Sequence, residues 1–340
     1  MMHRMTRGMV LAAVAAAGMS ATVWGSAAPV AQPAADRSTW RWYKGQTHAH
    51  TLESDGDSTP EEVTRWYQER GYQFLVLSDH NVLTRVDALS RQFGTPESFL
   101  LVPGEEITDR VDEKPLHVNG LNLTRLVPPQ GGDTVALALQ RDIDAIREAS
   151  GVPHINHPNF GWAIAPSDLA PLERYRLLEI YSGHPLVNNL GGDDAPGMEE
   201  VWDRLLTAGK RVYGIAVDDA HYFKRPWDSL APQPGKGWVV VRAPRLEAAA
   251  LMTSLENGDF YASTGVTLES YSASTSSIAV QVQAAGTTRY RLQLVSGGAV
   301  VATTDGLSAT FALAGRSGYA RVVVRDSNGA QAWAQPVFLP

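Results

Sequence analysis

The sequence predicts an α/β protein, a barrel of the (β/α) type followed by a small antiparallel β-sandwich. Between residues 40 and 265, apolar strand-like runs alternate with segments of helical periodicity, and this alternation implies parallel βαβ units. It continues for too long to suit a small open sheet, so a barrel is favoured. From Val266 the runs are short, rich in Val and Thr, and separated by Gly, Ser, Asn and Asp. Such runs are typical of a β-sandwich.

The boundaries of the elements follow from start and stop residues. A strand over residues 40–50 leads to a helix over 58–71, in which Ser58 or Thr59 is the N-cap and Gly71 is the stop. Further strands are expected over 72–80, 98–106, 151–158, 176–184, 211–221 and 238–244, and further helices over 133–151, 197–210 and 246–258. The expected domains are a signal peptide (1–28), a linker (29–39), the barrel (40–265) and the β-sandwich (266–340).

The N-terminus has the pattern of a secretory signal. Arg4 and Arg7 precede a mostly apolar, Ala-rich stretch over residues 9–23, and small residues follow over 25–28. A membrane anchor is the alternative, but a spanning helix needs about 20 apolar residues and a stop-transfer flank. We therefore expect a periplasmic or secreted protein without a membrane anchor after cleavage. Because the chain has no cysteine, its exported form must be stabilised without disulfides.

The charge of the chain argues against a nucleic-acid partner. The formal net charge is -7, whereas phosphate backbones are held by an excess of Lys and Arg. A small-molecule ester or phosphoester is the expected partner. The oligomeric state is left open by the sequence.

Histidines and carboxylates gather where the predicted strands end. Of the nine histidines, His3 leaves with the signal, and His154 lies close to a strand end. Six others lie at such ends: His48, His50, His80, His157, His184 and His221. A single histidine at a strand end is usually structural, but the carboxyl ends of barrel strands form the active site in this architecture. Six occurrences beside carboxylates therefore predict a functional site.

The stretch "THAHTLESDG" indicates a metal site. His48 and His50 are two residues apart on a strand, so both imidazoles point to the same face. Asp55 can bring an oxygen ligand from the following loop, and Asp219 and His221 repeat the same spacing late in the chain. Imidazoles with carboxylates suit Zn, Mn, Fe or Co, whereas soft-metal sites need thiolates.

These motifs together resemble those of the PHP family, the polymerase and histidinol phosphatase metallohydrolases. The resemblance covers residues 40–266 and lies in six segments in the family's order: "THAHTLESDG", "LSDHN", "PGEE", "LHVNGL", "INHPN" and "VDDAH". The signal, "ENGDFYASTGV" and the trailing "AWAQPVFL" are similar to the carbaryl-hydrolase-like branch of that family. The resemblance implies a distorted (β/α)7 barrel.

The resemblance also implies a site for two or three divalent transition-metal ions, Zn, Mn or Fe. Its ligands would be His48, His50, Asp55, His80, Glu106, His117, His157, Asp219 and His221. Glu106 is preferred to Glu105 because the family motif is Gly-x-Glu. Glu106 and Asp79 are the predicted catalytic residues, although Asp79 more often orients than ligates in the family. His154 and Asn156 are expected to support the ligands.

Two features depart from the family pattern. Some members have His where this chain has Asp55, so the occupancy of a third metal position is open. The late motif carries an additional acid, Asp218, directly before Asp219.

The expected activity is hydrolysis by a metal-bridging hydroxide. Phosphomonoester or phosphodiester cleavage is the first choice, because several cations suit an anionic tetrahedral group. A carboxylic or carbamate ester hydrolase is the alternative, and a non-catalytic, exported metal-binding protein is the second alternative. The candidate substrate-binding residues are His184, Glu179, Arg225 and Lys236. A nucleophilic-residue hydrolase is disfavoured, since the chain has no Cys and no G-x-S-x-G elbow.

Overall fold

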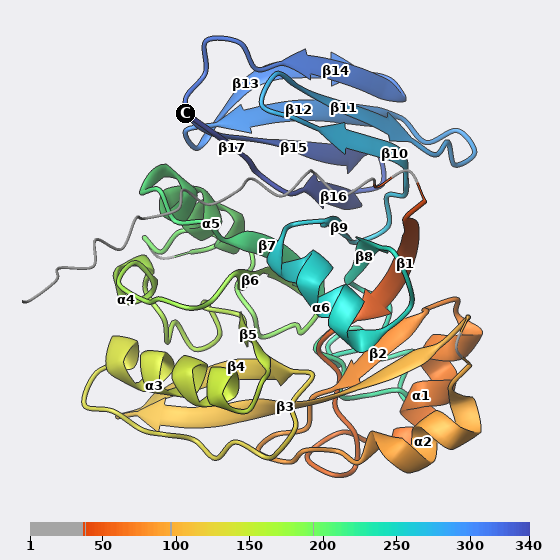
Figure 1. Ribbon diagram of the computed structural model, residues 1–340, viewed down its shortest axis with the longest axis vertical. Coiled ribbons are helices and arrows are strands. Elements are labelled where there is room, and N and C mark those ends of the chain that lie inside the picture. The colour runs from red at the N-terminus through yellow and green to blue at the C-terminus, as the bar shows by residue number, and fades with distance from the viewer. Residues whose placement is uncertain (1–36, 38, 96, 193) are drawn as a thin grey trace, which may run out of the picture. The chain divides into compact units, whose positions relative to one another are not determined.

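The structure, a computed structural model, describes residues 37, 39–95, 97–192 and 194–340 (Figure 1). The predicted signal peptide lies outside the described residues, as does most of the predicted linker. Within the described part of the chain, no helix is long and apolar enough to cross a membrane. Residues 38–340 form one compact unit.

The predicted α/β fold with a parallel core is confirmed. One sheet contains β1 (Arg41–Gln46), β2 (Phe74–Leu77), β3 (Leu100–Val111), β4 (Lys114–Leu121), β5 (Val152–Ile155), β6 (Leu177–Ser182) and β7 (Tyr213–Val217) in this spatial order. On the other side of β1, the sheet continues with the antiparallel strands β8 (Trp238–Ala243) and β9 (Phe260–Ser263). Within the first series, all neighbours are parallel except those of β4.

The antiparallel β4 interrupts the predicted βαβ pattern for a simple reason. Val111 of β3 pairs with Lys114 of β4, so a two-residue connection joins the strands. Asp112 in this connection has a φ of 52°, which suits a tight hairpin turn. A connection this short can join only antiparallel strands.

The two outer strands of the series meet at their carboxyl ends. The His50 amide donates to the Ala220 carbonyl at 2.9 Å, and the Asp219 amide donates to the His48 carbonyl at 3.1 Å. Within the described residues this is a bridge at Ala49 and Ala220 rather than a continuous ladder between β1 and β7. It nevertheless fixes the loops after the first and last strands against each other.

The helices connect strands, and those between parallel strands return the chain so that both strands end on the same side. They are α1 (Pro60–Glu69), α2 (Val86–Phe93), α3 (Val135–Glu148), the short α4 (Pro166–Leu169), α5 (Met198–Thr207) and α6 (Ala248–Glu256). Thr59, not Ser58, is the N-cap of α1, because its hydroxyl accepts from the Glu62 amide while the Glu62 carboxylate accepts from the Thr59 amide. The side chains of Val63 and Tyr67 on this helix are buried.

The antiparallel character predicted for the C-terminal residues is also confirmed. The strands β10 (Leu268–Ala273), β11 (Ser277–Val282) and β14 (Ser308–Ala312) form one sheet. The strands β12 (Tyr290–Ser296), β13 (Ala299–Asp305), β15 (Gly318–Asp326) and β16 (Gln331–Ala334) form a second, and β17 (Val337–Leu339) pairs with β15. Val280, Phe311, Leu292 and Val322 from both sheets share one buried core.

The C-terminal strands are bound tightly to the barrel strands. β16 pairs with β9, so the second sheet continues into the barrel sheet. The Gln335 amide both donates to and accepts from the backbone of Gly214 in β7, at 2.8 and 2.9 Å. The buried Arg321 guanidinium of β15 binds Asp203 of α5 at 2.6 and 2.8 Å. The two predicted domains therefore share a sheet and a buried ion pair.

We predict that Arg321→Met destabilises the protein by about 3–5 kcal/mol, because the buried Asp203 carboxylate would lose its guanidinium partner. Urea unfolding followed by circular dichroism measures the change. The matched control is Arg291→Met, which breaks an exposed ion pair with Asp305 in the same C-terminal sheet. This substitution should change the free energy of unfolding little. Equal effects of the two substitutions would show that the buried ion pair does not hold the C-terminal strands in place.

Candidate metal centre

All nine predicted ligands come together on the side where the parallel strands have their carboxyl ends, and His117 reaches it from the antiparallel β4. His48, His50 and Asp55 follow β1, His80 follows β2, Glu106 and His117 lie in β3 and β4, His157 follows β5, and Asp219 and His221 follow β7. Each belongs to at least one of four overlapping groups whose ligand atoms lie within 4.8 Å of one another.

Four of these residues form a compact set, which we call the cage: His48, His50, Glu106 and Asp219. The Nε2 atoms of His48 and His50 are 3.1 Å apart. Each lies 3.2–3.3 Å from Glu106 Oε2 and 3.3 Å from Asp219 Oδ1. Tetrahedral ligands about 2.0–2.1 Å from a transition-metal ion are separated by about 3.3 Å. The five separations are close to this value, so His48 and His50 could share an ion with a buried carboxylate.

Glu106 connects the cage to a second group. Its Oε2 atom lies 3.1 Å from His80 Nδ1, and its Oε1 atom lies 3.0 Å from His117 Nδ1. His157 Nε2 is 3.5 Å from Glu106 Oε1 and 3.6 Å from Asp219 Oδ2. The two oxygens of one carboxylate thus face different sets of nitrogens, as they would in a carboxylate that bridges two ions.

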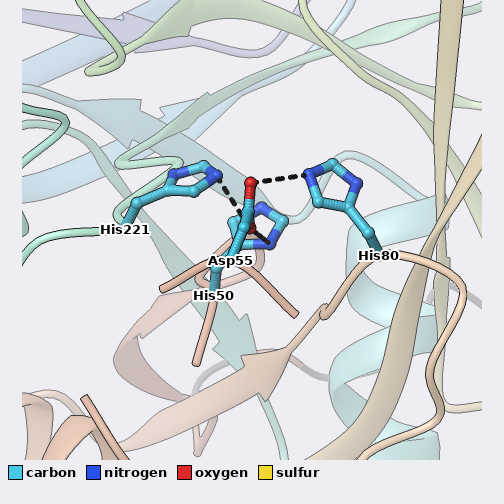
Figure 2. A group of neighbouring side chains, drawn as sticks. All are labelled: His50, Asp55, His80 and His221. Atoms are coloured by element: carbon cyan, nitrogen blue, oxygen red, sulfur yellow. Dashed lines mark ion pairs between the residues drawn. The ribbon is translucent and has the colours of Figure 1, made fainter. Parts of the chain in front are cut away.

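Asp55 lies among the imidazoles of a third group, as Figure 2 shows. Its carboxylate is 3.3 Å from His221 Nε2, 3.6 Å from His50 Nδ1 and 3.6 Å from His80 Nε2. The side chain is 55% exposed, whereas Glu106 and Asp219 are buried. This group is therefore the side of the centre that faces solvent. His50 and His80 also belong to the deeper groups. Because a neutral imidazole offers a lone pair at only one nitrogen, each of them could bind an ion in one of its two groups but not in both.

The electrostatics keep the carboxylates ionised inside the protein. Burial would raise the pKa of Glu106, but the charges of His48, His117 and His80 hold it well below its usual value. Burial lowers the pKa of His50, but contacts with Asp219 and Glu106 outweigh this effect and raise it to about 9. The buried carboxylates thus stay ionised by pairing with positive charge, which protonated imidazoles or a bound cation can supply.

Two buried atoms of the centre fit a metal ion directly. Glu106 Oε2 and His117 Nδ1 are shielded from solvent, and within the described residues neither makes a hydrogen bond of acceptable geometry. Such atoms are rare in native proteins and call for an ion or water. A divalent cation would satisfy both, so the residues present fit the metal that the sequence predicts.

Glu179 holds two of the ligand residues, His48 and His157, in place. It is fully buried, its Oε1 atom lies 2.7 Å from His48 Nδ1, and its Oε2 atom accepts from the His157 amide at 2.8 Å. A proton on His48 Nδ1 leaves the Nε2 lone pair free to face an ion. Contact of Glu179 with a substrate stays a prediction. The buried His154 lies 3.4 Å from the same carboxylate.

Asp79 holds the loop that carries Asp55. Its carboxylate accepts hydrogen bonds from the Thr51 amide and hydroxyl, from the Ser54 hydroxyl and from the Thr84 hydroxyl, at 2.6–2.9 Å. These are the contacts of a positioning residue, and a direct catalytic role for Asp79 stays a prediction.

Asn156 restrains Glu106, as expected of a supporting residue. Its amide donates to Glu106 Oε1 at 2.7 Å and to Asn119 Oδ1 at 2.9 Å. Sequence reasoning did not find Asn119, since a buried asparagine in a strand carries no motif of its own.

Asp218, the additional acid of the late motif, anchors a distant loop. It accepts hydrogen bonds from the backbone amides of residues 235, 236 and 237 and from the Tyr67 hydroxyl, at 2.5–2.8 Å. This fixes the C-terminal end of the loop over residues 222–237, which carries Arg225 and Lys236. The doubled acid was the signal in the sequence, but its partners could not be inferred from it.

The remaining substrate candidates border the centre unequally. The half-buried His184 ring lies 5.4 Å from the His221 ring, centroid to centroid, and burial lowers its pKa to about 4. Arg225 is exposed, with its guanidinium 4.5 Å from the Tyr222 ring, and Lys236 is exposed on the same loop. Contact of these two cations with a substrate stays a prediction.

Phe160 is a further residue that the sequence did not reveal. Its ring lies 5.3 Å from His157, 5.9 Å from His117 and 5.9 Å from His184, centroid to centroid. An aromatic ring against three imidazoles forms an apolar wall beside the centre.

Comparisons with known proteins agree with this architecture. No protein-family profile and no curated protein matches the chain. Among solved structures, a two-domain protein from Bacteroides vulgatus, described as containing a predicted PHP-like metal-dependent phosphoesterase, is 15% identical, with a TM-score of 0.52. The match covers 88% of this chain and 96% of that chain. The chain has a PHP-like fold. An amidohydrolase from Chromobacterium violaceum is 16% identical, with a TM-score of 0.40, over 53% of this chain and 88% of that chain.

We predict that Glu179→Gln lowers the affinity for zinc by about 10- to 100-fold, because the carboxylate no longer orients the His48 imidazole. Competition with a chromophoric chelator measures the affinity, and circular dichroism checks the fold. The control is Glu200→Gln, an exposed glutamate that pairs with Arg204 on α5. Unchanged zinc affinity in Glu179→Gln would contradict the assigned support role.

Proposed function

We propose that the protein is a metal-dependent hydrolase that cleaves phosphoesters. The observation that carries the proposal is the cage, in which the His48 and His50 imidazoles lie within 3.3 Å of two buried carboxylates and which shares Glu106 with a second group of ligands. Bound divalent ions would lower the pKa of a coordinated water from about 15.7 toward neutrality and neutralise charge on the reacting group. The PHP-like fold is consistent with this chemistry.

The residues of the chain have distinct roles in the proposed reaction. Glu106 would hold two ions side by side, because its two oxygens face different nitrogens. Glu179 and Asn156 keep the deep ligands in one orientation through hydrogen bonds. The exposed group around Asp55 would receive the anionic end of the substrate, since it is the side of the centre that solvent reaches.

A carboxylic or carbamate ester is the second candidate substrate. The loops after β6 and β7, which carry His184 and His221, expose large apolar side chains: Leu186, Leu190, Trp227 and Leu230. Together with Phe160, they favour a substrate with an apolar group. Membership of the carbaryl-hydrolase-like branch and export through the N-terminal signal belong to this proposal. A non-catalytic metal-binding protein is the alternative from another class.

We predict that the protein as purified without chelator contains more than one equivalent of zinc, manganese or iron, and that removing the metal abolishes hydrolysis. His48→Ala should lower both metal content and activity, the latter by several orders of magnitude, because one of the four cage atoms is lost. Elemental analysis and assays on bis(p-nitrophenyl) phosphate, p-nitrophenyl phosphate and p-nitrophenyl acetate measure these effects.

The Glu200→Gln variant serves again as the control, with unchanged metal content and rates. Hydrolysis of the acetate but of neither phosphate would favour the ester hydrolase. Full activity in metal-free protein would refute a metal-dependent reaction. Bound metal without hydrolysis of any of the three esters would favour the non-catalytic alternative.

A further inference from the structure

We propose that His184 is a neutral hydrogen-bond donor whose Nε2–H group binds an oxygen of the substrate's phosphoryl group. The inference rests on the proposed function, which it deepens by adding a substrate contact outside the metal ligands. It is carried by the placement of the ring beside the centre and by a backbone contact that fixes which ring nitrogen holds the proton.

The His184 ring lies beside the centre but outside every ligand group. It follows β6, is half-buried, and lies edge-on to the rings of His221, at 5.4 Å, and Phe160, at 5.9 Å. A group in this position can reach a substrate that is held by the metals without itself competing for an ion.

The backbone fixes the tautomer of this imidazole. The Leu186 amide donates a hydrogen bond to His184 Nδ1 at 3.2 Å, so Nδ1 must present its lone pair. The proton of the neutral ring is then on Nε2. Because the two nitrogens lie on opposite sides of Cε1, Nε2 points away from the turn that binds Nδ1. Among the described residues, no hydrogen-bond partner for Nε2 is present.

The turn that carries His184 is itself held in place. The His184 amide donates to the Ser182 hydroxyl at 3.2 Å, and the Ser182 amide donates to Asn189 Oδ1 at 2.9 Å. The Nε2–H group is therefore positioned before substrate binds. Preorganised donors of this kind stabilise charge that develops on an oxygen during reaction.

Two substitutions separate substrate binding from a structural role. In His184→Gln the side-chain amide can place its N–H near the former Nε2, whereas in His184→Asn the side-chain oxygen can replace Nδ1 as acceptor for the Leu186 amide. We expect His184→Gln to keep kcat/KM for the phosphoester within about 10-fold of the wild type. His184→Asn and His184→Ala should each lose about 100-fold, the lower end of the effect of removing one transition-state donor.

Two measurements on zinc-loaded protein do not depend on turnover. Calorimetric titration with inorganic phosphate should rank the wild type and His184→Gln above His184→Asn and His184→Ala. In two-bond ¹H–¹⁵N spectra, the His184 resonance is identified as the one that is missing from the His184→Gln spectrum. In the wild type this resonance should have the pattern of a neutral ring protonated at Nε2. If the wild type cleaves no phosphoester, the proposed function fails, and these two measurements still decide the role of His184.

Two results would overturn the proposal. In the first, His184→Asn matches the wild type while His184→Gln behaves like His184→Ala, so that His184 only caps its own turn. In the second, the spectra place the proton on Nδ1.

Discussion

The buried charge of Glu106 is the constraint on which the rest of the centre depends. A carboxylate in the interior is costly unless cations and hydrogen-bond donors surround it. Here it lies on β3 with imidazoles within 3.5 Å from four other segments, and with the Asn156 amide on one oxygen. The strand ends must converge on this point for the charge to be tolerated. The barrel and the ligand set are therefore parts of a single arrangement.

The antiparallel β4 is what makes this convergence possible around Glu106. A parallel strand would need a long crossover, whereas the hairpin through Asp112 returns the chain at once and pairs Glu106 with Asn119. His117, two residues before Asn119, then lies on the same face and reaches Glu106 Oε1. The antiparallel β4 thus supplies the ligand His117. It is the main feature of the barrel that the alternation of strands and helices in the sequence did not predict.

The predictable part of the site is the part with local signals. The spacing of His48 and His50 and their place at a strand end indicated a shared face, and both lie in the cage. His117 came from the family resemblance alone, since nothing in its strand marks it as a ligand. The contact of Glu179 with His48 could not be predicted, because the two residues are 131 positions apart. Contacts of this kind depend on barrel geometry, which the local sequence does not encode.

The doubled acid links the centre to the loop at its mouth. Asp219 has a φ of 50°, a left-handed conformation that costs free energy for most residues but that aspartate tolerates. On its N-terminal side, Asp218 binds three successive amides of residues 235–237, and on its C-terminal side His221 faces Asp55. These contacts hold the turn in its unusual conformation and so direct Asp219 into the cage. Asp218 thereby ties residues 235–237 to the turn that places Asp219 in the cage.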